Sequence, residues 1–354
     1  MLEIRSYEGS PEELSEFVII QWTASYRGKI AVPLWSGEYF RWQLRMDEPE
    51  QRRHIIAAYD GGQLVGVVPF FPMQFRLDDD PFAASQASWL SVAPEYQGQG
   101  VARKLIDGAR AVHRDLGLKF QLGFAYYGRQ ASLAPAFWLR SQTSSTATIR
   151  KVGFWVRVLN ASRAAEWNSD YFEGLFTRAT APLFGAPQTR QVPNLVIRPA
   201  EERDVARCLE LAEQSTRHCR LRLAWDEHSL RRQLGLHGFN HALVAEEDGE
   251  LRGCITYYLL QLQGVTLETF GFLDLVFVSE LSSPARKALL DSVLLKIQQR
   301  GAVSALKLRV GDYPRDLFIR SGWIFRPPDS HVLVTWAAEP HHLRSPGRMH
   351  VLWR

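Results

Sequence analysis

Hydrophobic and polar positions along the first third of the chain follow two different periods. Residues 54–60 and 63–75 are apolar runs rich in Val, Ile and Phe, and Gly61-Gly62 between them supplies the positive φ angles of a two-residue hairpin turn. Residues 101–112 instead carry Val, Leu, Ile and Ala at three- and four-residue spacing, which predicts a helix with one apolar side. Hairpin strands and an amphipathic helix therefore follow one another, as in an α+β domain.

Further elements flank this region. Residues 10–13 (SPEE) combine a capping Ser, Pro at the first helical position and Glu at the third, which predicts a helix running to about Tyr26. Residues 36–38 (SGE) predict the start of a second, short helix. The remaining predicted elements are strands at 2–7, 87–94, 119–127 and 153–160 and a helical segment at 131–141.

The same order of elements returns in the second half of the chain. Its predicted members are a strand and helix at 194–214, a helix at 226–235, a hairpin at 241–261 turned by Asp248-Gly249, a strand at 268–280, a long helix at 283–301, a strand at 303–310, a short helix at 313–320 and a strand at 331–336. We therefore predict an α+β protein with two tandem domains, each a mixed, mostly antiparallel sheet flanked by helices. The first domain is expected at 1–160 and the second at 194–337. An irregular connection at 161–193 joins them, and a tail follows at 338–354.

Length, composition and charge agree with two soluble domains. The 354 residues exceed the size at which one core stops growing, about 250 residues. The formal charge of +4 is spread thinly, which suits an anionic ligand and not a nucleic acid. Three cysteines without CxxC spacing indicate neither structural zinc nor a disulfide framework, and Asp78-Asp79-Asp80 is expected to be a solvated connection, so we expect no metal.

The sequence carries no targeting or membrane signal that we recognise. The first residues, MLEIRSYEGSPEELSEF, lack the charged-then-apolar pattern of a signal peptide, and no run approaches the ~18 apolar residues that a membrane span needs. We expect no membrane span, a cytoplasmic location, and a monomer or homodimer.

One short stretch carries candidate chemistry. Gln97-Gly98-Gln99-Gly100-Val101-Ala102 leads from a predicted strand directly into the amphipathic helix. Small residues here expose the unpaired amides of the helix's first turn, and together with the helix dipole these amides can hold a phosphate or pyrophosphate. The alternative is a tight turn that needs glycine only for its dihedral angles. A dinucleotide-binding βαβ unit is disfavoured because hairpins surround the segment.

The residues around this stretch resemble motif A of the GNAT acyltransferase superfamily. The pattern V-x-P-x-x-Q-x-x-G-x-A is matched by Val92, Pro94, Gln97, Gly100 and Ala102. The resemblance implies that the amides of residues 98–102 hold the pyrophosphate of acetyl-CoA or another acyl-CoA. It also implies that the strand Trp89, Leu90, Ser91 and Val92 lines the pantetheine arm. The thioester carbonyl would then lie against a backbone amide near Trp89 or Leu90.

The second copy lacks this cradle. Residues 277–289 (FVSELSSPARKAL) contain neither glycine, Pro284 removes an amide, and the side chains of Ser282, Ser283 and Arg286 crowd the turn. We infer that the second domain does not bind coenzyme A in the usual way and expect it to shape the acceptor site.

An active half followed by a degenerate half is similar in layout to N-myristoyltransferases. Residues 36–44 (SGEYFRWQL) resemble that family's S-P-E-F-L-x-W-x-L, residues 89–92 stand where it has F-L-C-V, and residues 137–141 (FWLRS) resemble its Y-W-H-R-S. The chain departs from the family at 322–328, which replaces a glycine-rich signature, and at QGQG, which replaces a basic phosphate loop. The match is therefore architectural.

Acyl transfer to an amine also needs a proton acceptor and a donor for the leaving thiolate. GNAT enzymes often place a tyrosine on the helix where this chain has Phe137 and Trp138, so the nearest phenols are Tyr126 and Tyr127. Alternation along a strand points these two to opposite faces, so at most one faces the cleft, and both could simply pack at a strand end. In the myristoyltransferase comparison the base is the terminal carboxylate, here that of Arg354, unless the tail is frayed.

Three functions remain open on the sequence. The first is an acyl-CoA-dependent N-acyltransferase, with acetyl the foremost acyl group, that acts on a primary amine of a small molecule or peptide. The second is a longer-chain, myristoyltransferase-like N-acyltransferase. The third is a non-catalytic acyl-CoA-binding or interaction protein, which the missing helix tyrosine and the degenerate second half would fit.

Overall fold

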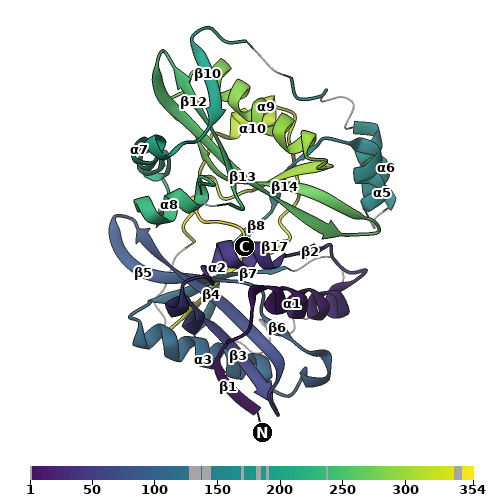
Figure 1. The fold of residues 1–354 in the computed structure, drawn as a ribbon. Helices are drawn as coiled ribbons and strands as arrows, with labels where there is room; N and C mark the ends of the chain where they lie inside the picture. The colour runs from purple at the N-terminus through teal and green to yellow at the C-terminus, as the bar shows by residue number, and fades with distance from the viewer. Residues whose placement is uncertain are drawn as a thin grey trace. The chain divides into compact units, whose positions relative to one another are not determined.

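The computed structural model describes residues 2–126, 137, 145–168, 171–180, 185–188, 191–236, 238–338 and 345–354. The chain divides into two compact units, and neither is continuous in sequence. Unit 1 consists of Met1–Val152, Asp329–Gly347 and Arg354, and unit 2 consists of Gly153–Pro328 and Arg348–Trp353. Figure 1 labels many of the elements of both units.

Unit 1 is built on a mixed sheet. Its strands follow the order β1 (Leu2–Ser6), β3 (Ile55–Asp60), β4 (Gln63–Leu77), β5 (Asp80–Ala87), β7 (Phe120–Tyr126), β17 (Ser330–Trp336) and β8 (Thr146–Val152). Neighbouring strands are antiparallel except β5 and β7, which are parallel with Gln86 opposite Leu122. A two-residue strand, β6 (Ser91–Val92), pairs with β4. The parallel pair is joined by the crossover that contains the amphipathic helix predicted above.

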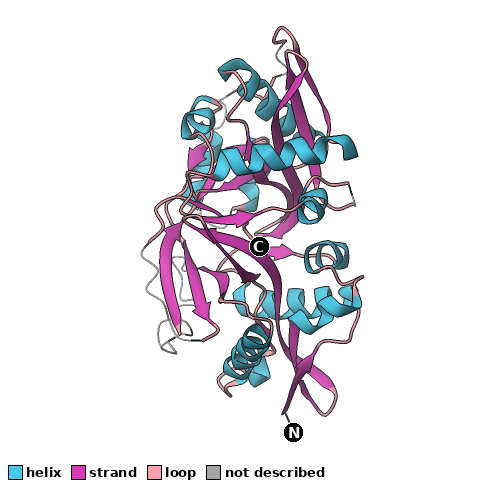
Figure 2. Cartoon of the chain, turned by 90° about the vertical axis from the view of Figure 1, so that its left-hand side faces the viewer, coloured by secondary structure: helices cyan, strands magenta, loops and turns pink. Residues whose placement is uncertain are grey.

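The helices of unit 1 flank its sheet, as Figure 2 shows. They are α1 (Pro11–Tyr26), α2 (Gly37–Leu44), α3 (Val101–Asp115) and the 3-10 turns η1 (Pro49–His54) and η2 (Pro94–Tyr96), with the short strand β2 (Val32–Leu34) between α1 and α2. The capping box predicted at Ser10 and Glu13 forms at the start of α1. The apolar side of α3 buries Val101, Leu105 and Ala109 in the core of the unit.

Unit 2 repeats the architecture with a second mixed sheet. Its strand order is β10 (Leu195–Pro199), β12 (His241–Glu247), β13 (Glu250–Gln263), β14 (Leu267–Phe277), β15 (Ser304–Leu308), β9 (Phe154–Val158) and β16 (Ile324–Phe325), and only β14 and β15 are parallel. The strands β11 (Leu221–Ala224) and β18 (Met349–His350) pair with each other in parallel. Its helices are α5 (Ala161–Trp167), α6 (Tyr171–Thr180), α7 (Val205–Thr216), α8 (Glu227–Gln233), α9 (Ser283–Gln299), α10 (Arg315–Arg320) and the turn η4 (Glu202–Asp204). The predicted hairpin turn is confirmed, with positive φ at Asp248 and Gly249.

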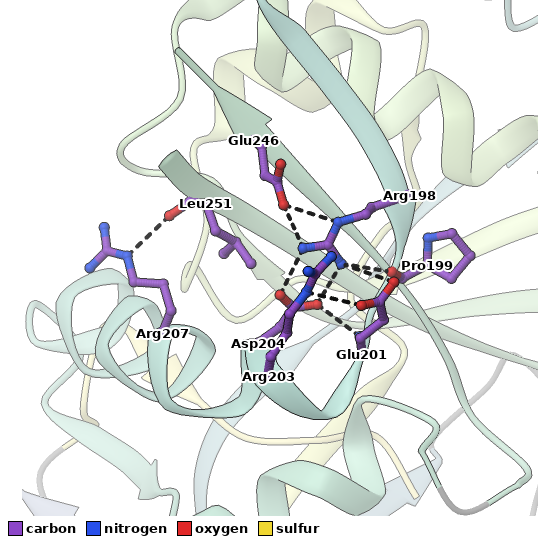
Figure 3. Close-up of polar contacts among 8 residues, drawn as sticks. All are labelled: Arg198, Pro199, Glu201, Arg203, Asp204, Arg207, Glu246 and Leu251. Carbon is purple, nitrogen blue, oxygen red and sulfur yellow. Dashed lines mark hydrogen bonds and ion pairs between the residues drawn. The ribbon is translucent and has the colours of Figure 1, made fainter. Parts of the chain in front are cut away.

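A dense ion-pair cluster fixes one corner of unit 2 (Figure 3). The Arg198 guanidinium on β10 makes a two-pronged contact with the Asp204 carboxylate, at 2.7 and 2.8 Å, and its Nε donates to Glu246 on β12 at 3.0 Å. Burial alone would raise the pKa of Asp204, but hydrogen bonds from Arg198 and from the Glu201 amide hold it below its usual value. The cluster ties β10 and β12 to the start of α7.

The structure confirms the predicted fold class and corrects several elements. The strand predicted at 87–94 is wrong: β5 occupies 80–87, the chain bends at 88–90, and only β6 continues as strand. The connection expected to be irregular contains α5 and α6, and β8 was not predicted. The helical segment predicted at 131–141 lies outside the described residues except for 137. Within the described ranges, no helix combines the length and apolarity needed to cross a membrane.

The two units exchange one strand each. The strand that ends the first series of elements, β9, pairs with β15 and β16 of unit 2, and the last strand of the second series, β17, pairs with β7 and β8 of unit 1. The domain limits predicted at 160, 193 and 337 follow the order of elements along the chain and stay a prediction.

Candidate active site

The QGQG turn forms an open cradle at the start of α3. Gly98 and Gly100 have φ angles of 78° and 80°, in the left-handed region that side chains other than glycine disfavour. A Cβ atom at either position would meet no atom within 4 Å. Gly100 is the N-cap and provides no side-chain hydrogen bond, and the first helical bond runs from the Lys104 amide to the Gly100 carbonyl at 3.0 Å. The first-turn amides, including those of Val101 and Ala102, therefore face an uncrowded space.

The glutamines of the turn hold its own backbone. The Gln97 side-chain amide donates to the Val92 carbonyl at 3.1 Å and to the Ser25 hydroxyl at 3.2 Å, and the Gln99 side chain donates to the Glu95 carbonyl at 2.6 Å. These contacts fix the turn against α1 and η2. The glutamines therefore shape the cradle, and the atoms left for an anion are the backbone amides.

The corresponding turn in unit 2 is closed by the chain's own carboxylate. Glu247 at the end of β12 is buried and accepts hydrogen bonds from the Ser282 amide, at 2.9 Å, and from the Ser282 hydroxyl. Ser282 is the N-cap of α9, and its side chain also accepts from the Ala285 amide. A negative charge already lies at this helix start, where the dipole would otherwise attract a phosphate.

The chain bends sharply between β5 and β6, at the predicted thioester position. Trp89 has a φ angle of 60°, although its side chain is 2% exposed and bulky. A left-handed conformation costs a residue other than glycine about 1–2 kcal/mol, so the surrounding contacts must hold it in place. Ser91 and Val92, which follow the bend, pair with Val67 and Gly66 of β4.

A residue that the sequence did not single out supports this bend. The Trp22 indole N–H on α1 donates to the Ser91 hydroxyl at 3.1 Å, and that hydroxyl donates to the Trp89 carbonyl at 2.8 Å. Trp22 and Trp35 pack edge to face at 4.9 Å between ring centroids. In the sequence, Trp22 is recognisable only as a tryptophan on the inward side of the predicted first helix. Such a residue indicates core packing as readily as a role in a functional site.

The proposed proton donor lies at the same edge of the sheet as the bend. Because β5 and β7 are parallel and adjacent, their carboxyl ends meet at one edge. Tyr126 is the last residue of β7, half-buried and opposite Ser330 of β17. Tyr127 and Trp138 lie outside the described residues.

Arg354 is ordered within unit 1. It is only 3% exposed, its backbone oxygen accepts a hydrogen bond from the Ser88 hydroxyl, and its Nε donates to the Gln43 side chain on α2. The guanidinium also lies 5.2 Å from the Trp42 ring centroid. The structure therefore brings Arg354 to the residue that precedes Trp89, and it is not frayed.

The chain resembles acyltransferases in family and fold. Residues 21–131 match the acetyltransferase (GNAT) domain. That match contains the cradle, the bend and α3. The family match supports the assignment of the protein as an acyl-CoA-dependent N-acyltransferase. No curated protein matches the chain. Among the described residues, no three His, Cys, Asp or Glu side chains gather as metal ligands.

Solved structures show that the tandem GNAT-like fold extends over both units. A structure of Saccharomyces cerevisiae N-myristoyltransferase with bound myristoyl-CoA is 13% identical, with a TM-score of 0.71 over 96% of this chain and 84% of that one. A GCN5-related N-acetyltransferase from Kribbella flavida is 15% identical, with a TM-score of 0.52 over 94% and 71%. A probable N-acyltransferase from Enterococcus faecalis V583 is 11% identical, with a TM-score of 0.53 over 94% and 72%.

Proposed function

We propose that the protein is an acyl-CoA-dependent N-acyltransferase that moves a short acyl group, acetyl foremost, to a primary amine of a small molecule or peptide. The observation that carries this proposal is the open cradle of unit 1. Two left-handed glycines and a fifteen-residue helix without a side-chain cap leave the amides of residues 98–102 available for a pyrophosphate. In unit 2 the matching position is filled by Glu247, so the two helix starts differ in what they can bind.

The surroundings of Trp89 support a short acyl group. The Trp89 ring lies 5.4 Å from Phe40, 5.8 Å from Tyr39 and 6.3 Å from Trp35, measured between centroids. All four side chains are almost completely buried. Close-packed rings leave little room beside the bend for a long hydrocarbon chain.

The proposed reaction is direct attack of the amine on the thioester. The amine nitrogen bonds to the carbonyl carbon, an amide near Trp89 or Leu90 stabilises the oxyanion, and the C–S bond then breaks. Tyr126 is the proposed proton donor to the thiolate, and the proton that the attacking nitrogen loses as the amide forms restores the Tyr126 phenol. The amine must first lose a proton, since its free pKa is about 8 for an α-amine and about 10.4 for a lysine. In a chain that ends at Arg354, the oxygen that Ser88 contacts belongs to a carboxylate, which we propose accepts this proton.

Ligand-induced thermal stabilisation tests the cradle. The purified protein is heated with acetyl-CoA, a long-chain acyl-CoA or free coenzyme A, and the experiment is repeated with Gly100→Gln. The matched control is Gly117→Gln, because Gly117 follows the other end of α3, also has a positive φ (67°), and also has open space where a Cβ atom would lie, with nothing within 4 Å. Both variants carry similar backbone strain, but only Gly100→Gln places a side chain at the cradle.

We expect stabilisation by acetyl-CoA in the wild type and in Gly117→Gln, and its loss in Gly100→Gln. A stronger shift with the long-chain acyl-CoA would favour the longer-chain alternative. Release of free thiol with a panel of amines then separates an enzyme from a binding protein. Absence of stabilisation by any of the three ligands would mean that QGQG is only a turn, and the proposal would fall.

A further inference from the structure

Trp22 on α1 is linked to the thioester position by two consecutive hydrogen bonds. Its indole N–H contacts the Ser91 hydroxyl at 3.1 Å, and the Ser91 hydroxyl contacts the Trp89 carbonyl at 2.8 Å. Ser91 is 3% exposed, so bulk water cannot readily replace either partner. We call this pair of bonds the Trp22–Ser91 relay.

The relay has a fixed direction. An indole N–H can only donate, whereas a hydroxyl has one proton and can rotate to donate or accept. Trp22 therefore makes the Ser91 oxygen an acceptor on one side, and the single Ser91 proton is left to point at the Trp89 carbonyl. Without the Trp22 N–H, the Trp89 carbonyl alone would orient that hydroxyl, and its oxygen would lose the donor that fixes the other side.

Holding the Trp89 carbonyl also orients the next amide. The peptide unit between Trp89 and Leu90 is planar and trans, so its C=O and N–H point in opposite directions. When Ser91 holds the carbonyl on one side, the Leu90 N–H is aimed to the other. Among the described residues, this N–H has no hydrogen-bond acceptor.

We propose that Trp22 is a positioning residue for acyl transfer. Through Ser91 it holds the left-handed bend at Trp89 and so aims the Leu90 amide at the oxygen of the thioester carbonyl. This inference rests on the proposed function. It adds a residue of α1 to the site and gives the buried Ser91 hydroxyl an orienting role instead of a contact with the pantetheine arm.

The test removes the N–H and keeps the ring. Trp22→Phe deletes the donor, Ser91→Ala deletes the hydroxyl, and Ser91→Thr retains it. The matched control is Trp167→Phe in unit 2, which deletes an indole hydrogen bond of the same kind, to the Leu262 carbonyl at 2.9 Å. Steady-state kinetics with acetyl-CoA and a reactive amine give kcat and KM for each variant, and thermal unfolding gives its stability.

We expect Trp22→Phe and Ser91→Ala each to lower kcat roughly tenfold to hundredfold, because a misplaced oxyanion donor stabilises the transition state less well. The KM for acetyl-CoA should change less than about twofold. The double variant should be no slower than the slower single variant, and Ser91→Thr should recover most of the rate. Trp167→Phe should keep the wild-type kcat. An unchanged kcat in Trp22→Phe, or an equal loss in Trp167→Phe, would overturn the inference.

A spectroscopic measurement separates the relay from the proposed function. In a ¹H–¹⁵N spectrum, the indole resonance of Trp22 should move in Ser91→Ala and stay near its wild-type position in Ser91→Thr. An unmoved resonance in Ser91→Ala would show that the relay does not exist, whatever the activity. If the resonance moves but the wild type transfers no acyl group, the proposed function is wrong, and with it the positioning role of Trp22 in acyl transfer.

Discussion

Acid should destabilise unit 1, because His113 lies neutral in its core. The ring is 1% exposed, its Nδ1 contacts the Ala109 carbonyl at 2.6 Å, and its Nε2 contacts the Ser85 hydroxyl at 2.6 Å. The carbonyl can only accept, so Nδ1 carries the proton and Nε2 accepts from Ser85. Burial lowers the pKa of His113 from 6.5 to about 4, despite the bond to Ala109 that would raise it.

The sign and size of the effect follow from this difference. The unfolded chain takes up a proton on His113 below pH 6.5, whereas the folded chain does so only near pH 4. The stabilisation is therefore complete above pH 6.5 and is lost as the pH falls toward 4, by about 3 kcal/mol in total. His54, which contacts the same Phe70 ring, has its pKa lowered to about 4 by burial and should add to the loss.

Denaturant unfolding between pH 7.5 and pH 4.5 measures this loss. The unfolding free energy should fall less steeply with decreasing pH in His113→Gln than in the wild type. The difference in slope should reach about 1.4 kcal/mol per pH unit below pH 6.5. Leu105→Ala is the control: it weakens the same core without touching a titratable group and should leave the slope unchanged. Equal slopes in the wild type and His113→Gln would refute the reasoning.

Three further predictions concern other parts of the chain. In denaturant unfolding, Asp204→Asn should lower the unfolding free energy by about 3 kcal/mol, because it removes the charged, two-pronged partner of a largely buried Arg198. The control, Arg203→Gln, breaks an exposed ion pair and should cost less than about 1 kcal/mol. Trp89→Ala should raise kcat/KM for an eight-carbon acyl-CoA relative to acetyl-CoA by about tenfold, since it opens space beside the bend, and an unchanged ratio would contradict the packing argument. A Gly-Ser extension after Arg354 should lower kcat about hundredfold without changing acetyl-CoA binding, and full turnover would exclude the carboxylate as base.

Elements whose signals are local could be predicted from the sequence. The cap of α1 at Ser10, the glycine turn between β3 and β4, and the helix after QGQG all depend on residues within a few positions of one another. The cradle belongs to this class, because the left-handed glycines and the helix start without a side-chain cap adjoin in the chain. Its backbone geometry could therefore be predicted before the fold was known, whereas the binding of an anion there stays a proposal.

The bend at Trp89 could not be predicted, because its cause is distant. Tryptophan rarely adopts a positive φ, and the apolar run at 87–92 favours a continuous strand by its composition. The conformation is held by Ser91 and by Trp22, which is 69 positions away from Ser91. The closure of the second cradle has the same origin, since Glu247 reaches Ser282 from a strand 35 positions earlier.

The strand β8 and the exchanged strands escaped prediction for related reasons. Residues 146–152 (TATIRKV) contain few apolar positions, and the strand is specified by pairing with β17. The place of β9 beside β15 depends on a partner far along the chain. A sequence reading gives the order of elements but not which of two similar sheets each strand joins.

The position of β17 in the sheet of unit 1 has a consequence for synthesis of the protein. Because β17 lies between β7 and β8, this sheet cannot close until the ribosome has translated roughly 180 residues beyond the end of β8 at Val152, which takes about 10 to 40 s at common elongation rates. During that interval β7 and β8 present unpaired edges on a nascent chain, where they can pair with other polypeptides. Cells that make this protein quickly would need chaperones to shield those edges, and fragments that stop before Ser330 should aggregate instead of yielding a working N-terminal half.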